Sequence, residues 1–346
     1  MGKPQLTLRL RLLTPAFLAG ADQGVAELRA PSIKGLLRFW WRATQASNSR
    51  MAEQEKSIFG SAGDEVKGGC SAFTLQISPS RPANAISKSP FPKNGDTQYQ
   101  VKGHSLNILE YLAYGTYTYQ KSEHCNVFDR SYIKSGQVFT LIIRLVRNDA
   151  LNAVVQALSA FYAFGGIGAR SRNGFGSMVL ETVDGDSSLE KLIQSTPPGV
   201  FKSFANGKHL PDFTAFSGQT RLFRTRTHHQ TWDSCLAELG HAYRAARLSI
   251  ESKHHYSVRQ FIGAPLIVDK RQKSLLSRHA KPYFLRIHKD SNGYVGYILY
   301  LPSQYYPKKI EDTSGRELTP EQMTSRFLHA CDAINTALSK SLEAIR

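Results

Sequence analysis

The succession of strand and helix patterns predicts an α+β protein with two similar halves. Residues 1–184 show the order β-α-β-β-α-β, and a comparable order begins again at residue 211. The first order is that of a ferredoxin-like, or RRM-like, unit, in which an antiparallel sheet carries two helices on one face. The length of 346 residues also suits two domains of ordinary size. We therefore expect two tandem ferredoxin-like domains with insertions.

The first strand and the first helix have clear patterns. Residues 5–12 alternate strictly, with leucines on one side and Arg9 and Arg11 on the other, which is typical of a half-buried strand. Ser32 is a good N-cap for a helix that we expect to run to about residue 46. The remaining elements of this domain are expected as strands at 71–77, 138–147 and 177–183 and a helix at 149–164.

Two segments interrupt this plan. An insertion of roughly residues 80–135 separates the second and third strands, and its part at 106–119 is expected to form a helix. Residues 185–210 contain Asp, Ser, Pro-Pro and Gly and are predicted to be a linker. The second, divergent domain then spans residues 211–346, without a clear last strand before the chain ends. Its expected elements are a strand at 216–227, a helix at 232–249, a hairpin at 283–301 around Ser291-Asn292-Gly293 and a closing helix at 322–342.

The charge of the chain indicates a polyanionic partner. The formal net charge is +17 and the isoelectric point is about 9.7, which favours nucleic acid first and an anionic membrane surface second. The sequence has no apolar run long enough to span a membrane. Its four cysteines are scattered and form no CxxC pair, so neither a metal site nor another cofactor is indicated. Unpaired cysteines fit a cytoplasmic location.

A glycine-rich segment at residues 165–176 is the most informative part of the chain. It contains five glycines together with Arg170 and Arg172, and such a loop can approach phosphate closely while supplying fixed positive charge. It follows a helix and precedes a strand, whereas a nucleotide-binding Gly-rich loop precedes a helix. We therefore expect it to contact the backbone of a nucleic acid. The candidate residues are Gly166, Gly168, Arg170, Arg172, Asn173, Gly174 and Phe175.

A basic stripe on the first predicted helix is the second candidate. Lys34, Arg38 and Arg42 recur every four residues and include no acid, although such a stripe could also be a merely solvated helix face. Two strand faces are weaker, secondary candidates for RNA binding. Their residues are Arg9, Arg11, Arg224 and Arg226.

Several motifs resemble the RAMP superfamily of CRISPR proteins, and most closely the Cmr subunit-one family of type III-B effector complexes. The resemblance lies in Ser32-Ile-Lys-Gly-Leu-Leu-Arg-Phe-Trp-Trp-Arg42, in the Gly-rich loop, and in the similar segments at 14–20, 58–61, 111–115, 262–265 and 278–287. One departure concerns the position before Pro282, where the usual serine is replaced by Lys281.

The resemblance implies a non-catalytic RNA-binding subunit of a cytoplasmic antiviral complex. Proteins of that family lie near the 3′ end of the crRNA, engage target RNA and assemble with other Cmr subunits. Because phosphate contacts carry no base identity, such binding should be largely independent of sequence.

The alternative function is a RAMP endoribonuclease that acts on crRNA precursor or on target RNA. Some relatives use a histidine general base near the first helix, but the first histidine here is His104. Others use a loop aspartate with a divalent metal; Asp22 and Asp64 lie in predicted loops but lack a neighbouring acid. A membrane-surface or small-nucleotide binder is a third class, and no terminal amphipathic helix or Walker motif supports it.

Overall fold

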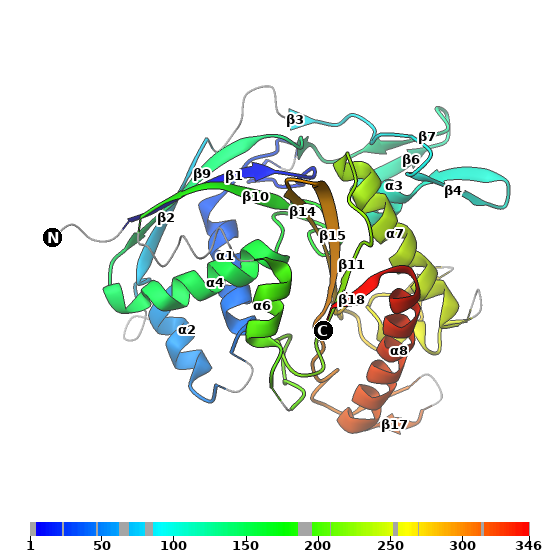
Figure 1. Ribbon diagram of the computed structural model, residues 1–346. Helices are drawn as coiled ribbons and strands as arrows, with labels where there is room; N and C mark the ends of the chain where they lie inside the picture. The colour runs from blue at the N-terminus through cyan, green and yellow to red at the C-terminus, as the bar shows by residue number, and fades with distance from the viewer. Residues whose placement is uncertain are drawn as a thin grey trace.

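The computed structural model stacks four layers: a sheet, a pair of helices, a second sheet and a second pair of helices (Figure 1). This arrangement is a mixed α and β fold, as the sequence predicts. The structure describes residues 5–22, 24–45, 48–61, 69–79, 86–185, 196–207, 209–251, 255–268, 270–312 and 315–345.

The first sheet is four-stranded and fully antiparallel, with the order β10-β1-β9-β2. The helices α1 (Ala30–Ala43) and α4 (Leu151–Phe164) pack against each other on one of its faces. Leucines alternate along β1 and point toward these helices, so the predicted half-buried strand is confirmed. The strands are β1 (Gln5–Leu12), β2 (Phe73–Ser78), β9 (Val138–Leu145) and β10 (Met178–Asp184).

The second sheet has the order β14-β15-β11-β18 and is also antiparallel. It is covered by α7 (Trp232–Ser249) and α8 (Pro320–Ser341). In each sheet, the last strand of the half pairs with the first, and the third strand lies between the first and the second. The strands are β11 (Arg221–Arg224), β14 (Tyr283–Asp290), β15 (Gly293–Tyr300) and β18 (Glu343–Ile345).

The smaller elements lie mainly in the insertion and in the connecting segments. Two hairpins of the insertion, β4–β5 and β6–β7, project together at one end of the molecule (Figure 1). The smaller helices are α2 (Met51–Phe59), α3 (Ile108–Leu112), α6 (Pro197–Phe204), η1 (Asn148–Ala150) and η3 (Arg259–Phe261). The smaller strands are β3 (Ile86–Ser87), β4 (Gln98–Val101), β5 (His104–Asn107), β6 (Tyr117–Gln120), β7 (Cys125–Phe128), β8 (Tyr132–Ile133), β12 (Ile267–Val268), β13 (Arg271–Gln272), β16 (Ile310–Glu311) and β17 (Glu317–Leu318).

Several predicted boundaries are wrong for local reasons. The helix expected at 106–119 is only the short α3, because Gly115 has a left-handed backbone (φ 86°) and the tyrosines after it enter β6. Ser32 lies inside the first turn of α1 rather than at its N-cap, which is Arg29. The expected linker contains α6, whose N-cap Thr196 accepts a hydrogen bond from the Gly199 amide.

The second half has a last strand that the sequence does not reveal. β18 is only three residues long and pairs with β11, so the expectation that the chain lacks this strand is wrong. The prediction of a helix at 232–249 is confirmed by α7, and the hairpin around Gly293 is confirmed by β14 and β15.

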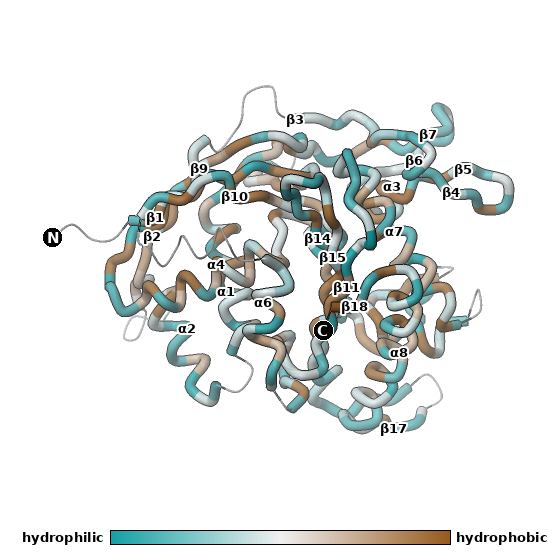
Figure 2. Tube along the Cα trace, in the orientation of Figure 1, coloured by the Kyte–Doolittle hydropathy of each residue, from teal (hydrophilic) through white to brown (hydrophobic). Residues whose placement is uncertain are grey.

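The strands β14 and β15 are buried on both faces over most of their length, which explains the apolar runs at 283–285 and 297–300. Phe284 and Leu299 pack into the core that includes α1 and α4, whereas Leu285 and Ile298 pack into the core that includes α7 and α8. Figure 2 shows the resulting hydrophobic colour in the central strands, while the projecting hairpins are mostly hydrophilic.

The helix layer of α1 and α4 is therefore shared by both sheets. Trp41 packs against Phe59 of α2 beside the first sheet, with ring centroids 5.9 Å apart and the planes tilted by 57°. The neighbouring Trp40 faces the second sheet, and its ring lies 5.3 Å from that of Phe284. Buried Arg286 of β14 adds polar contacts to this junction, since its Nη2 donates to two carbonyl oxygens, of Tyr162 (3.0 Å) and Met178 (2.7 Å).

Replacement of Trp40 by alanine tests this shared layer. Trp40 is 2 % exposed, so Trp40→Ala should lower the free energy of unfolding by about 3–5 kcal/mol, measured by urea denaturation. Val146→Ala is the control, because Val146 is 43 % exposed and should change stability by less than about 0.5 kcal/mol. Equal stabilities of the two variants would contradict the shared layer.

Candidate nucleic-acid interface

The Gly-rich loop is shaped by close backbone contacts. Gly168 has φ 87°, and a Cβ there would collide with the carbonyl oxygen of Phe17. A Cβ at Gly166 would lie 2.8 Å from the carbonyl oxygen of Phe175. Gly174 has φ 91° and packs against the side chain of Leu236 in α7. These glycines are therefore required for packing, whatever the loop binds.

The loop connects three parts of the molecule. Asn173 Nδ2 donates to the carbonyl oxygen of Leu112 in the insertion (2.5 Å). The Leu285 amide of β14 donates to the Arg172 carbonyl oxygen (3.0 Å), and the Ile287 amide donates to Ser177 Oγ (3.1 Å). The first sheet, the insertion and the second sheet thus meet at this loop.

Arg172 braces the loop from inside. Its Nη1 donates to the Lys281 carbonyl oxygen (2.5 Å), and its guanidinium carbon lies 4.3 Å from the centre of the Phe284 ring. Burial lowers the pKa of Arg172 to about 10, so the side chain is still charged at neutral pH. Such a cation over an aromatic ring stabilises the contact between the loop and β14.

Arg170, in contrast to the half-buried Arg172, lies at the surface. It is exposed, and its backbone is left-handed (φ 61°), a conformation that L residues rarely adopt. Its guanidinium group lies over Gly115, where any side chain would collide with it. Arg170 is therefore held at the surface of the insertion and is open to a ligand.

A cleft of about 760 Å³ opens beside the loop. We call it the basic cleft, because four cationic side chains line it and none of its lining residues is acidic. These cations come from the loop, from α7 and from the segment before β14. The charged and aromatic lining residues are Tyr111, Tyr114, Arg170, Arg172, Tyr243, Arg247, His279 and Lys281.

The electrostatics of the basic cleft favour an anion. Burial, followed by the charges of Arg247, Arg172 and Arg170, holds the pKa of Lys281 well below its usual value. Lys281 Nζ lies 4.3 Å from the centre of the Tyr243 ring. Burial, with a contribution from Arg172, also lowers the pKa of His279 to about 4, so this imidazole is neutral at pH 7.

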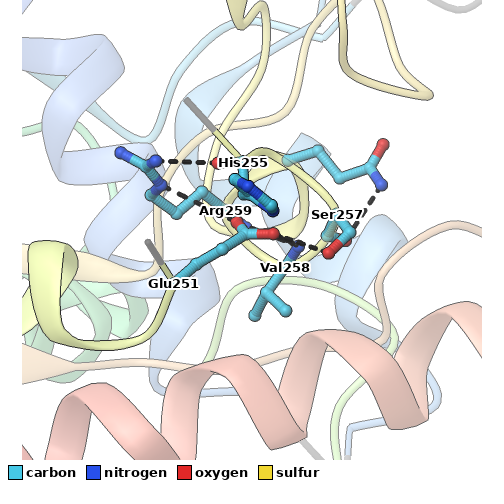
Figure 3. Close-up of polar contacts among 6 residues, drawn as sticks. Glu251, His255, Ser257, Val258 and Arg259 are labelled. Carbon is cyan, nitrogen blue, oxygen red and sulfur yellow. Dashed lines mark hydrogen bonds and ion pairs between the residues drawn. The ribbon is translucent and has the colours of Figure 1, made fainter. Parts of the chain in front are cut away.

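A buried carboxylate fixes the turn that precedes Ala264 in the chain (Figure 3). Glu251, whose side chain is 7 % exposed, accepts hydrogen bonds from the Val258 and Arg259 amides and from Ser257 Oγ (2.6 Å). Burial opposes its ionisation, but these hydrogen bonds prevail and lower the pKa of Glu251. The turn that they fix leads to Ala264, which lines the cleft and exchanges backbone hydrogen bonds with His279.

Phe175 does not lie in the cleft. Its ring is completely buried and stacks on Phe91 at 5.4 Å. Phe175, one of the candidate residues, therefore cannot offer its ring to an RNA base. The physical reason is that the insertion, which the sequence shows only as a long interruption, covers this side of the loop.

The predicted basic stripe faces α2 and β2 rather than the cleft. Lys34 Nζ lies 5.3 Å from the centre of the Phe73 ring. Arg38 and Arg42 pair with the same carboxylate, Glu55 of α2, at 3.4 and 3.6 Å. The sequence shows no acid on the helix itself, and the partner comes from a helix that was not predicted.

The secondary candidates also have intramolecular partners. Arg9 and Arg11 both pair with Glu181 across the open face of the first sheet. Arg226 is directed to carbonyl oxygens at the C-terminal end of α8, at 3.3 to 3.4 Å. Arg224 is half-buried in β11, which ends at this residue.

Asp22, which was considered for catalysis, and the adjacent histidines His228 and His229 are engaged in local contacts. Asp22 accepts a hydrogen bond from the Gly24 amide, as in a turn. His228 pairs with Asp290 at 3.0 Å and His229 with Glu238. Across the part of the chain that the structure describes, no three His, Cys, Asp or Glu residues are grouped as metal ligands would be. Asp64 lies outside the described residues.

Residues 9–179 match the family model of the RAMP superfamily. Over these residues, about half of its length, the chain belongs to the RAMP superfamily. In sequence this RAMP protein is similar to the CRISPR system Cmr subunit Cmr1-1 of Pyrococcus furiosus, with 26% identity over 157 residues, or 44% of this chain and 40% of the relative. The aligned part thus spans less than half the length of that relative.

Solved structures show the same fold over nearly the whole RAMP protein. Cmr1 from Pyrococcus furiosus in its apo form matches with a TM-score of 0.54 and 15% identity, covering 98% of this chain and 97% of that one. A chain of the type III-B Cmr-beta complex, bound to cognate target RNA and AMPPnP in the presence of ssDNA, matches with a TM-score of 0.51 and 15% identity, covering 96% and 100%. The chain therefore resembles the Cmr subunit-one family in sequence and fold.

None of the described helices of this RAMP protein has the length and apolar character that a membrane span requires.

The two loop arginines of this RAMP protein should respond differently to substitution. Arg172→Ala removes a buried hydrogen bond and a cation–π contact, so it should lower the free energy of unfolding by about 2–4 kcal/mol. Arg170→Ala is the matched variant and should change stability by less than about 0.5 kcal/mol, because Arg170 is exposed. Chemical denaturation measures both values, and a larger loss for Arg170→Ala would contradict these assignments.

Proposed function

We propose that this protein is a non-catalytic RNA-binding subunit of a type III-B Cmr ribonucleoprotein. It would act in the cytoplasm, in antiviral defence, and contact crRNA, target RNA or both near the 3′ end of the crRNA. The observation that carries the proposal is the basic cleft at the Gly-rich loop, which gathers Arg170, Arg172, Arg247 and Lys281 without a lining carboxylate. Cations without acids are the electrostatic footprint of a nucleic-acid site.

The comparisons support the assembly part of the proposal. The matching Cmr-beta chain belongs to a complex that contains cognate target RNA, and the curated relative is a subunit of a Cmr system. By analogy, other Cmr subunits and crRNA are the expected partners.

We also propose a division of the chain into two tandem ferredoxin-like domains, residues 1–184 and 211–346, joined by residues 185–210. Both halves have the succession β-α-β-β-α-β, and both sheets have equivalent strand orders. The basic cleft would then lie where the Gly-rich loop of the first domain meets the segment before β14 in the second.

Purification of the tagged protein from its native cells tests the proposal. We expect it to be recovered with several other Cmr subunits and with RNA of uniform, guide-like length, as detected by mass spectrometry and RNA sequencing. Recovery of the folded protein without RNA and without other subunits would contradict the proposal.

The non-catalytic role can be tested separately. Purified protein incubated with end-labelled RNA and Mg²⁺ should leave the RNA intact, because the histidines and Asp22 described above are engaged in pairs and turns rather than in a catalytic group. Site-specific products that disappear in Asp22→Ala would instead establish the endoribonuclease alternative.

A further inference from the structure

The basic cleft has features that a general cationic surface lacks. Arg172, Arg247 and Lys281 are half-buried, and two buried nitrogen atoms of its lining residues, Arg247 Nε and His279 Nδ1, have no hydrogen-bond partner. Arg247 is nevertheless fixed, since its Nη1 donates to the hydroxyl group of Tyr111 (3.0 Å). Holding several hydrogen-bond donors so close together costs free energy unless an anion accepts their hydrogen bonds.

We propose that the basic cleft binds the sugar-phosphate backbone of single-stranded RNA and excludes a duplex. Arg170, Arg247 and Lys281 contact the phosphate oxygens, while Arg172 holds the Lys281 backbone in place through its hydrogen bond. This inference rests on the proposed RNA-binding function. It specifies which kind of RNA is bound and at which site.

The size of the cleft selects a single strand. A volume of about 760 Å³ lies within the range of about 300–1,000 Å³ that is typical of small-molecule sites. It can therefore accept a short stretch of nucleotides but not a double helix, whose backbones lie on a wide convex cylinder. Lys281 lines the cleft with its Nζ at the Tyr243 ring, so a single strand that enters the cleft can contact it.

An aromatic ring at the rim is available to a base. Tyr114 is 73 % exposed, although large aromatic side chains are usually covered. It lies beside Arg170 in the lining of the cleft and meets Tyr117 edge to face at 6.5 Å, which leaves its ring at the surface. Unpaired bases stack on such rings, whereas the bases of a duplex are already stacked.

Lys281 also couples binding to protons. Its surroundings are Arg170 and Arg172 on the loop, Arg247 and Tyr243 on α7, and His279 on its own segment, with Tyr111 and Tyr114 on the insertion. Burial and the three arginines favour the neutral amine, so the pKa of Lys281 is low in the free protein. A phosphate in the cleft reverses this preference, so RNA binding takes up a proton and weakens as the pH rises.

Fluorescence anisotropy with the full-length protein tests the site. The probes are a labelled oligouridine and a labelled RNA duplex of equal strand length. We expect the oligouridine to bind at least about tenfold more tightly than the duplex. Tyr114→Ala should reduce oligouridine affinity by about 5- to 150-fold, whereas Tyr119→Ala, which removes a comparably exposed ring from the same insertion, should not.

The role of Lys281 is tested by substitutions at this position and by the pH dependence of RNA affinity. The wild-type affinity should fall as the pH rises through the lowered pKa of Lys281, by at most about tenfold per pH unit for one proton. Lys281→Met should weaken binding and flatten this dependence. Lys281→Arg, which is always charged, should restore binding without the dependence. Lys309→Met is the charge-matched control, because Lys309 is exposed and pairs with Glu317.

Two outcomes would overturn the inference. One is equal affinity for the duplex and the oligouridine. The other is unchanged affinity and unchanged pH dependence in Lys281→Met. If RNA binding persists in either case, the proposed function stands and the site is elsewhere; if the wild type binds neither probe, the inference and the RNA-binding role fail together.

Discussion

The burial of α1 and α4 between two sheets is the constraint on which the rest of the structure depends. Trp41 packs beside the first sheet and Trp40 against Phe284 of the second, so neither half can move without disturbing the other's core. Buried polar contacts of Arg286 add to this junction. The Gly-rich loop follows directly after α4, and it is therefore held against the second sheet with a fixed position and orientation.

This rigid junction allows several positively charged side chains to lie close together in the basic cleft. Arg172 is buried against Phe284 and positions Lys281, while Arg247 is fixed by Tyr111. Without an anion these cations repel one another, and this repulsion adds to the larger effect of burial in lowering the pKa of Lys281. The folded chain tolerates this arrangement because hydrophobic contacts on both sides of the helix layer hold the segments together. Once phosphate enters, its attraction to each cation offsets this repulsion.

Periodicity predicts those parts of the fold whose packing is local. α7 has the predicted bounds, since its apolar residues recur at helical spacing, and the hairpin of β14 and β15 follows from the turn at Gly293. β18 is too short to show a pattern, and its strand character comes from pairing with β11. The sequence alone identifies the Gly-rich loop and Arg170 as candidates for RNA binding. It does not identify Arg247 and Tyr114, because only tertiary contacts bring α7 and the insertion to the loop. For Lys281 there was a signal: a lysine stands before Pro282 where the family usually has serine.

Photo-crosslinking tests the central claim most directly, because it locates RNA on the protein without any substitution. Single-stranded RNA containing 4-thiouridine would be bound, irradiated and digested, and the crosslinked peptides identified by mass spectrometry. Our account predicts crosslinks at Tyr114 and in the peptides that contain Arg170 or Lys281. Crosslinks confined to the open face of the first sheet, around Arg9 and Arg11, would contradict it.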